Sequence, residues 1–364
     1  MNWFVIVLFI ISIILFLLTK YYRLKKDYAY ESLEEFENKA NLTPTEILFN
    51  THNIKINYIT AKYAKNLIHK DGEYLQGMNQ ANLSARNCEN IDELYSKYLD
   101  GFDDITNDDK HIIDSFILNL IINIKNNNES YYKYIVKWLQ TINIAKAKPW
   151  LEDGMPHTLD NTIIMDANWF SKPRKTTFIH EITHVHQRLY PTEFEDLYPM
   201  LGYLYNPIDI KGLYSIYPLN RNNPDGASKY WLWGDNTTNT TTNFQTSYWW
   251  IGAIFKSVTP IKLTDVDMLA LKLDKGEDGI FYYLKQNPTP LKKLTNFVNF
   301  FGENPNNYHP NEMTAKFAEW YLTEILKNDE DLLNDSSNTR HNYNNFEGYI
   351  IYKKYIEKLI NTYY

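Results

Sequence analysis

Two histidines four residues apart, His180 and His184, constrain this chain more than any other feature. Residues at this spacing stand one turn apart on one face of an α-helix, so both imidazoles can point toward a single metal ion. The pattern therefore predicts a helix over residues 175–190. Apolar side chains on its opposite face would anchor this helix in a core: Phe178, Ile182, Val185 and Leu189.

The full motif is His180-Glu181-Ile182-Thr183-His184, in which Glu181 lies beside the histidines and can take a proton from a water molecule. A chance occurrence in a chain of this composition has odds of about one in a hundred. The alternative is a solvated helix with two idle histidines. Gln187 falls on the histidine face and is predicted to contact a histidine, whereas His186 points elsewhere and is not a predicted ligand.

The β-prone run Thr162–Met165, followed by the stretch His180–Gln187, resembles the zincin superfamily of metallopeptidases. The resemblance covers only this part of the chain. It implies that His180 and His184 bind Zn²⁺ and that Glu181 is the general base. It also implies that the run at 162–165 is an edge strand that holds an extended substrate above the motif helix.

The third zinc ligand distinguishes the branches of that superfamily. Metzincins continue with a glycine and a third histidine, where this chain has Gln187 and Tyr190, so that branch is excluded. The gluzincin branch takes a glutamate from a later helix, and Asn311-Glu312-Met313-Thr314-Ala315 fits its context. Pro310 favours a helix that begins there. Glu312 is therefore the expected third ligand and Glu319 the next candidate, while a carboxylate that only stabilises the helix N-terminus is the alternative.

A developing oxyanion needs a hydrogen-bond donor besides the metal. The candidates are Tyr308, His309 and His157, and for each of them a packed or solvated polar role is the alternative.

These residues predict a membrane-anchored, zinc-dependent metallohydrolase of the gluzincin type, which acts on a peptide or protein substrate. The same metal chemistry serves other acyl substrates, so a hydrolase of a different specificity stays open. The rival prediction is a catalytically inactive zincin-like structural or virion-associated membrane protein. An intact Glu181 favours the enzyme.

The net charge of −7 excludes a nucleic-acid partner, since phosphate contacts need a surplus of Lys and Arg. The single cysteine, Cys88, excludes a four-cysteine zinc site and an intramolecular disulfide framework. Lys, Asn, Ile and Tyr are frequent and have A/T-rich codons, which favours an A/T-rich genome as the source, such as that of a large DNA virus, a parasite or a low-GC bacterium.

The N-terminal residues 1–19 predict a retained single-pass transmembrane anchor, because residues 2–19 carry no charge and are long enough to span a bilayer. A cleaved signal peptide is less favoured, since no basic residue precedes the apolar run. The basic segment 20–30 follows it. The positive-inside rule then places the body of the protein on the cytoplasmic side of a cellular or virion membrane.

The sequence after the basic segment predicts an α+β fold that is mostly helical, with a zincin-like core of one short β-sheet and an active-site helix. A helical N-terminal region is expected over residues 31–148 and the metal-binding domain over 149–364. Residues 191–257 are expected to be irregular. Besides 175–190, helices are expected at 109–125, 131–146, 265–275, 290–301, 310–326 and 346–363.

For two further stretches, a purely structural role is favoured over a functional one. The turn-forming sequence Arg221–Gly226 predicts a plain loop. The aromatic clusters Tyr230–Trp233 and Tyr248–Trp250 predict core packing rather than a substrate or carbohydrate surface.

Overall fold

The computed structural model describes residues 54–70, 74–75, 77–205, 217–226, 231–235, 247–283, 287–303, 308–329, 332 and 343–363. The chain divides into two compact units, Met1–Pro44 and Thr45–Tyr364, and only the second contains described residues. The predicted anchor at 1–19 and the basic segment at 20–30 lie outside the described residues. Among the residues that are described, no helix is both long and apolar enough to cross a bilayer.

The first sheet of the second unit has the strand order β1-β3-β5-β4, and β2 pairs with one end of β3. β1, β3 and β5 run parallel, and β4 closes the sheet as an antiparallel strand. The strands are β1 (Lys55–Ile59), β2 (Phe102–Asp103), β3 (Thr141–Ala147), β4 (His157–Leu159) and β5 (Thr162–Asp166).

This sheet corrects three expectations. The run at 162–165 forms β5, which lies inside the sheet between β3 and β4, so the edge strand next to it is β4. The boundary expected between residues 148 and 149 does not separate two compact units, because β3 pairs with β5 across it. The helix expected at 131–146 ends at Trp138, and β3 begins at Thr141, because pairing with β1 and β5 overrides local helical periodicity.

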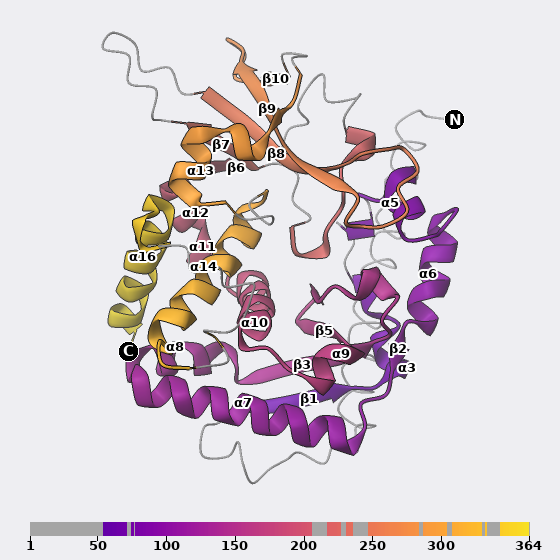
Figure 1. Ribbon diagram of the computed structural model, residues 1–364, viewed down its shortest axis with the longest axis vertical. Coiled ribbons are helices and arrows are strands. Elements are labelled where there is room, and N and C mark those ends of the chain that lie inside the picture. The colour runs from indigo at the N-terminus through magenta and orange to yellow at the C-terminus, as the bar shows by residue number, and fades with distance from the viewer. Residues whose placement is uncertain are drawn as a thin grey trace, which may run out of the picture. The chain divides into compact units, whose positions relative to one another are not determined.

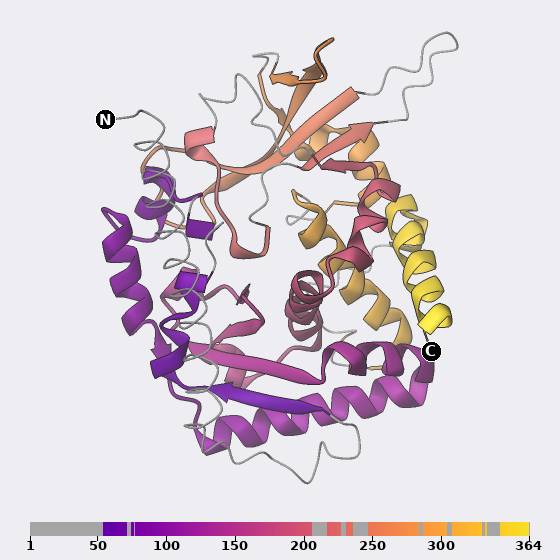
Figure 2. The same ribbon diagram turned by 180° about the vertical axis from the view of Figure 1, so that it is seen from behind.

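The second sheet has the order β10-β9-β8-β7-β6, is antiparallel between these strands, and includes β11 paired with β9. Its strands are β6 (Tyr203–Tyr205), β7 (Trp231–Asp235), β8 (Ser247–Phe255), β9 (Val266–Lys275), β10 (Phe281–Tyr283) and β11 (Thr289–Pro290). Figures 1 and 2 show the two sheets at opposite ends of the unit, with helices α10 and α14 between them.

Two more predictions are wrong in this sheet. Residues 191–257 are not wholly irregular, since they contain β6, β7 and β8. Residues 265–275 were expected to be helical, because Met, Leu, Ala and Lys are good helix formers. They form β9 instead, whose pairing with β8 places Leu271 and Leu273 in a buried cluster.

The helices expected at 109–125, 175–190, 310–326 and 346–363 are confirmed as α7 (Asn107–Asn127), α10 (Lys175–Leu189), α14 (Pro310–Ile325) and α16 (Glu347–Tyr363). The segment expected at 290–301 is α-helical only from Thr295, after a short 3₁₀ helix at Leu291–Lys293. The other α-helices in the described part of the chain are α3 (Ala61–Ala64), α5 (Gln80–Ala85), α6 (Ile91–Asp100), α8 (Glu129–Trp138), α9 (Ala167–Ser171), α11 (Thr192–Glu195), α12 (Leu197–Met200) and α13 (Thr295–Phe301).

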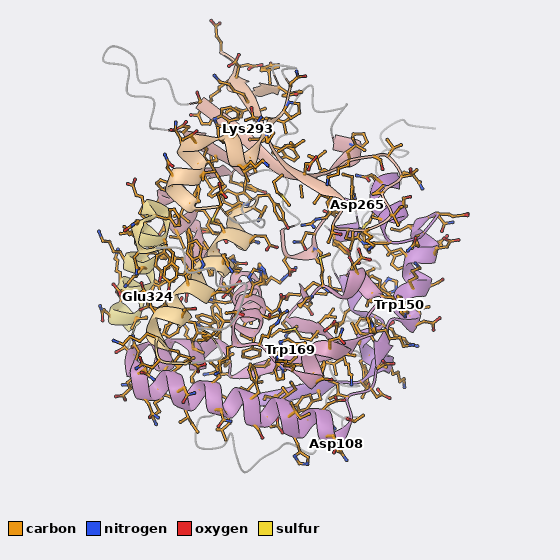
Figure 3. All side chains as sticks on the ribbon, in the orientation of Figure 1. Asp108, Trp150, Trp169, Asp265, Lys293 and Glu324 are labelled. Atoms are coloured by element: carbon orange, nitrogen blue, oxygen red, sulfur yellow. The ribbon has the colours of Figure 1, made fainter. Side chains whose placement is uncertain are left out.

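The motif helix α10 is held by aromatic packing on the side away from the histidines. Phe178 is fully buried and meets Phe116 of α7 edge-to-face, with ring centroids 5.8 Å apart. Trp169 of α9, labelled in Figure 3, lies against the same ring at 6.3 Å. Leu189 departs from the predicted stripe, because it ends the helix and its side chain is 47% exposed.

The predicted aromatic clusters pack in the core where the structure describes them. Trp233 is buried and meets Phe297 edge-to-face at 5.1 Å, and Trp250 is buried in the second sheet. Tyr230 lies outside the described residues.

The buried side of α10 offers a stability test. Ile182 is 1% exposed, so Ile182→Val is expected to cost about 0.5–1.5 kcal/mol in the free energy of unfolding by urea. The matched control is Ile112→Val on α7, where Ile112 is 42% exposed and a change within about 0.5 kcal/mol is expected. Equal effects at the two positions would show that Ile182 does not anchor the helix.

Candidate metal centre

Three side chains from two helices converge between the sheets. His180 and His184 extend from α10, and Glu312 from the first turn of α14. Their ligand atoms all lie within 4.8 Å of one another. Nε2 of His180 is 3.3 Å from Oε2 of Glu312, and Nε2 of His184 is 3.9 Å from Oε1 of the same carboxylate.

Hydrogen bonds set the tautomer of His184. Nε2 of Gln187 donates to the carbonyl oxygen of Asn311 at 2.9 Å and to the hydroxyl of Thr314 at 2.8 Å. The amide oxygen of Gln187 therefore faces Nδ1 of His184, at 2.8 Å, and Nδ1 must carry the hydrogen. Burial lowers the pKa of His184 to about 4, so the ring is neutral at pH 7 and its Nε2 carries a lone pair.

That Nε2 atom is buried and has no hydrogen-bond partner among the described residues. A buried polar atom without a partner carries a free-energy penalty. Because Nε2 of His184 lies near the carboxylate of Glu312, it is suited to bind a cation there.

His180 has a similar arrangement with a carboxylate behind it. Its Nδ1 lies 2.8 Å from Oε1 of Glu319, which is the carboxylate–histidine pairing that orients metal-binding imidazoles. Glu319, the second candidate for the third ligand, thus contacts the far nitrogen of His180. Burial acts to lower the pKa of His180, but hydrogen bonds and charge from Glu312 and Glu319 outweigh it and raise this pKa well above its usual value.

Glu312 is ionised in this environment. Burial alone would raise its pKa, but the hydrogen bond with His180 and the charges of the histidines and Arg221 lower it to about 2. Both ring nitrogens of His180 face carboxylate oxygens, and a neutral imidazole has a hydrogen for only one of them, so the other contact needs a second proton or a metal ion.

The donor set fits zinc. Two imidazole nitrogens and one carboxylate oxygen form a familiar catalytic zinc set, with bonds of about 2.0–2.2 Å. Tetrahedral ligands at that bond length stand about 3.3 Å apart. The His180–Glu312 pair has this separation, and small side-chain adjustments would bring His184 into range.

Glu181 lies beside this cluster. Its side chain is 4% exposed, and Oε2 accepts a hydrogen bond from the hydroxyl of Thr158 at 3.1 Å. Burial, together with the charge of Asp225, raises the pKa of Glu181 well above its usual value. Burial and the charge of Glu312 likewise raise the pKa of Asp225 to about 7.

The backbone of the edge strand β4 is already hydrogen-bonded at Thr158, the residue that contacts Glu181. The backbone N–H of Thr158 donates to Oδ1 of Asp225 at 2.8 Å, and its carbonyl accepts from Arg188 at 3.0 Å. A substrate strand therefore cannot pair with β4 at Thr158 unless these bonds break, which contradicts the role that the resemblance implied for the edge strand at this residue.

A cavity of about 1050 Å³ opens beside the cluster, and His180, Glu181 and Glu312 lie in its wall. Charged side chains from several elements also line it: Arg174, Arg221, Asp225, Lys292, Glu303 and Lys316. Apolar side chains from the second sheet and the helices that follow it complete the wall: Met268, Leu269, Leu291, Phe297, Val298 and Trp320.

The three candidate oxyanion donors have different positions. His157 on β4 lines the cavity and is 2% exposed, and its Nδ1 lies 3.0 Å from the carbonyl oxygen of Met155. Nδ1 therefore carries a hydrogen, and Nε2 is buried without a hydrogen-bond partner among the described residues.

Tyr308 and His309 do not line the cavity. Tyr308 donates to Oε1 of Glu312 at 3.4 Å. His309 is the N-cap of α14, where its Nδ1 accepts from the backbone N–H of Asn311 at 3.2 Å. A capping role explains His309 without any catalytic one.

The segment Arg221–Gly226 corrects the expectation of a plain loop. Asn223 donates to Oε1 of Glu312 at 2.7 Å, Asp225 bonds β4, and Arg221 lines the cavity. The Asn-Pro-Asp-Gly turn signal predicts the shape of this segment, but nothing in it predicts which part of the fold the turn contacts.

In comparisons with known proteins, no family model matches the chain, and neither a curated protein nor a solved structure is significantly similar to it. The function must therefore be inferred from the site itself.

Proposed function

We propose that this chain is a zinc-dependent metallohydrolase that cleaves peptide bonds, with His180, His184 and Glu312 as the zinc ligands. The observation that carries the proposal is the convergence of His184 Nε2, buried and without a partner among the described residues, with His180 and an ionised Glu312. Two nitrogens and one oxygen leave a coordination position open, as catalytic rather than structural zinc sites do.

Glu181 is the general base in this proposal. Zinc, when bound, supplies Lewis-acid polarisation of water and of the substrate carbonyl. Glu181 faces the same cavity as the ligands and is fixed by Thr158, so its carboxylate can accept the proton of the attacking water. Burial raises the pKa of Glu181 above its usual value, and a carboxylate with a higher pKa is the stronger base.

The cavity supports a peptide-sized substrate. At about 1050 Å³ it reaches the upper end of the usual range for ligand sites, and its wall mixes apolar side chains with cations and carboxylates. We also propose that the segment at 1–19, outside the described residues, tethers the chain to a membrane with its body on the cytoplasmic side.

Metal content tests the proposal. The purified full-length chain is expected to hold about one zinc ion, and His184→Ala and Glu312→Ala are expected to lose it, since three protein ligands are needed. The matched control is His111→Ala, because His111 is exposed on α7 and lies outside the cluster. Elemental analysis by mass spectrometry measures the ratio.

Two results would contradict the proposal. A folded wild-type chain without zinc, even after zinc is added back, would leave the inactive structural protein as the better account. Zinc that persists in both ligand variants would place the metal elsewhere.

A further inference from the structure

The segment Asn220–Gly226, called here the cleft loop, is attached to helix α5 by hydrogen bonds across the chain. Asn82 of α5 donates to the carbonyl of Asn220 at 2.7 Å, and its own side-chain oxygen accepts from the backbone N–H of Asn222 at 2.8 Å. Arg86 donates to the carbonyl of Asn222 at 3.2 Å. The backbone of the loop just before Asn223 is thus fixed from outside the metal cluster.

Asn223 extends from the cleft loop to Glu312 with a defined amide orientation. Its side-chain oxygen accepts from the backbone N–H of Asp225 at 3.3 Å, which leaves its Nδ2 to donate. Nδ2 lies 2.7 Å from Oε1 of Glu312 and also donates to the hydroxyl of Tyr308. Asn223 therefore donates its hydrogen bond to one particular oxygen of the Glu312 carboxylate, Oε1.

The two oxygens of Glu312 have different surroundings. Oε1 accepts from Asn223 at 2.7 Å and from Tyr308 at 3.4 Å. Oε2 lies 3.3 Å from Nε2 of His180, which is the ligand separation of a tetrahedral site. A carboxylate with one oxygen held by donors in this way binds a metal best through the other oxygen.

We propose that Asn223 is a positioning residue that holds Glu312 as a one-oxygen metal ligand through Oε2. The inference rests on the proposed function. With Oε1 held by Asn223, the carboxylate cannot turn to bind through both oxygens, and the coordination position beside it stays open for water and substrate. The anchoring contacts from Asn82 and Arg86 make α5 part of the support for the metal centre.

Cobalt substitution in the full-length chain tests whether Glu312 binds the metal through one oxygen or two, since the visible spectrum of Co²⁺ distinguishes four-coordinate from five-coordinate sites. The wild type is expected to give the intense spectrum of a four-coordinate ion. Asn223→Ala is expected to give the weaker five-coordinate spectrum, together with a zinc dissociation constant raised about 10–100-fold.

Asn223→Leu separates positioning from packing, because leucine fills the space and donates nothing. It is expected to behave like Asn223→Ala. The matched control is Asn220→Ala on the same loop, whose contact with Asn82 uses only the backbone, and it is expected to keep the wild-type spectrum and affinity. Thermal unfolding of each apoprotein checks that all variants fold.

The inference is overturned, with the proposed function intact, if wild type, Asn223→Ala and Asn223→Leu share one four-coordinate spectrum and one zinc affinity. It is also overturned if leucine restores the spectrum that alanine changes. A wild-type chain that binds neither Co²⁺ nor Zn²⁺ would overturn the proposed function and this inference together.

Discussion

Replacing Glu181 by glutamine is expected to lower peptide hydrolysis by about 10²–10⁴-fold, because the variant loses its general base. Glutamine matches glutamate in shape and can still accept the hydrogen bond from Thr158, which now joins Thr158 Oγ1 to Oε2 at 3.1 Å. It cannot take a proton from water. The zinc content of the variant is expected to equal that of the wild type, since Glu181 is not one of the three proposed zinc ligands.

A fluorogenic peptide library measures the loss on zinc-loaded full-length protein. The matched control is Glu303→Gln, because Glu303 lines the same cavity but is exposed and belongs to neither the ligands nor the base. Its activity is expected to stay within a factor of a few of the wild type, as for a solvated charge. Equal activity in the wild type and Glu181→Gln would remove Glu181 from the chemistry.

The second large effect concerns stability. Glu152→Gln is expected to cost about 3–5 kcal/mol in the free energy of unfolding, because it leaves a buried arginine charge unpaired. Arg86 and Glu152 are both almost fully buried, with Arg86 Nη2 2.8 Å from Oε2. Oε1 accepts from the hydroxyls of Tyr74 at 2.7 Å and Tyr98 at 2.8 Å.

Urea unfolding of the full-length chain measures this cost. The matched control is Glu129→Gln, whose ion pair with Lys133 at 3.4 Å is exposed. A loss of about 0.3–0.5 kcal/mol is expected for such a helical pair. Comparable losses at Glu152 and Glu129 would contradict the prediction.

The same pair predicts a pH dependence. Burial alone would raise the pKa of Glu152, but the charge and hydrogen bond of Arg86 lower it from 4.5 to about 2. The carboxylate thus binds protons less tightly in the folded chain than in the unfolded one. Its contribution to stability is complete above about pH 4.5 and is lost as the pH falls toward 2.

The difference in stability between the wild type and Glu152→Gln should therefore shrink as the pH is lowered through that window. A difference that stays constant down to pH values near 2 would show that the pKa of Glu152 is not lowered. Because Arg86 also bonds the cleft loop at Asn222, Glu152→Gln is expected to disturb the metal centre indirectly.

Sequence and structure agree best where the pattern is local. The helices α7, α10, α14 and α16 could be predicted, because each buries one stripe of side chains with a period of 3.6 residues. Glu312 was chosen as a ligand candidate because the sequence around it resembles the gluzincin context, and local signals predicted the helix that carries it. Its neighbour Pro310 and the buried residues that follow it fix both the start and the phase of α14.

Strand assignments failed because pairing depends on distant residues. Residues 266–275 contain good helix formers, and their pairing with β8, β10 and β11 makes them a strand. The edge of the first sheet was predicted wrongly for a different reason. The run at 162–165 is β-prone as expected, but the short segment just before it also forms a strand, β4, whose pairing with β5 leaves that run inside the sheet.

The sequence by itself determined the motif helix α10, because the spacing of His180 and His184 and the apolar stripe behind them are local properties of one element. It also determined that a metal site in this chain must use histidines and carboxylates, since Cys88 is the only cysteine. Only the tertiary structure decided that Glu312 meets the histidines while Glu319 lies behind His180. Only the tertiary structure showed that Asn223 and Asp225 belong to the site, because the sequence of a seven-residue turn predicts its local shape but not the residues that it contacts.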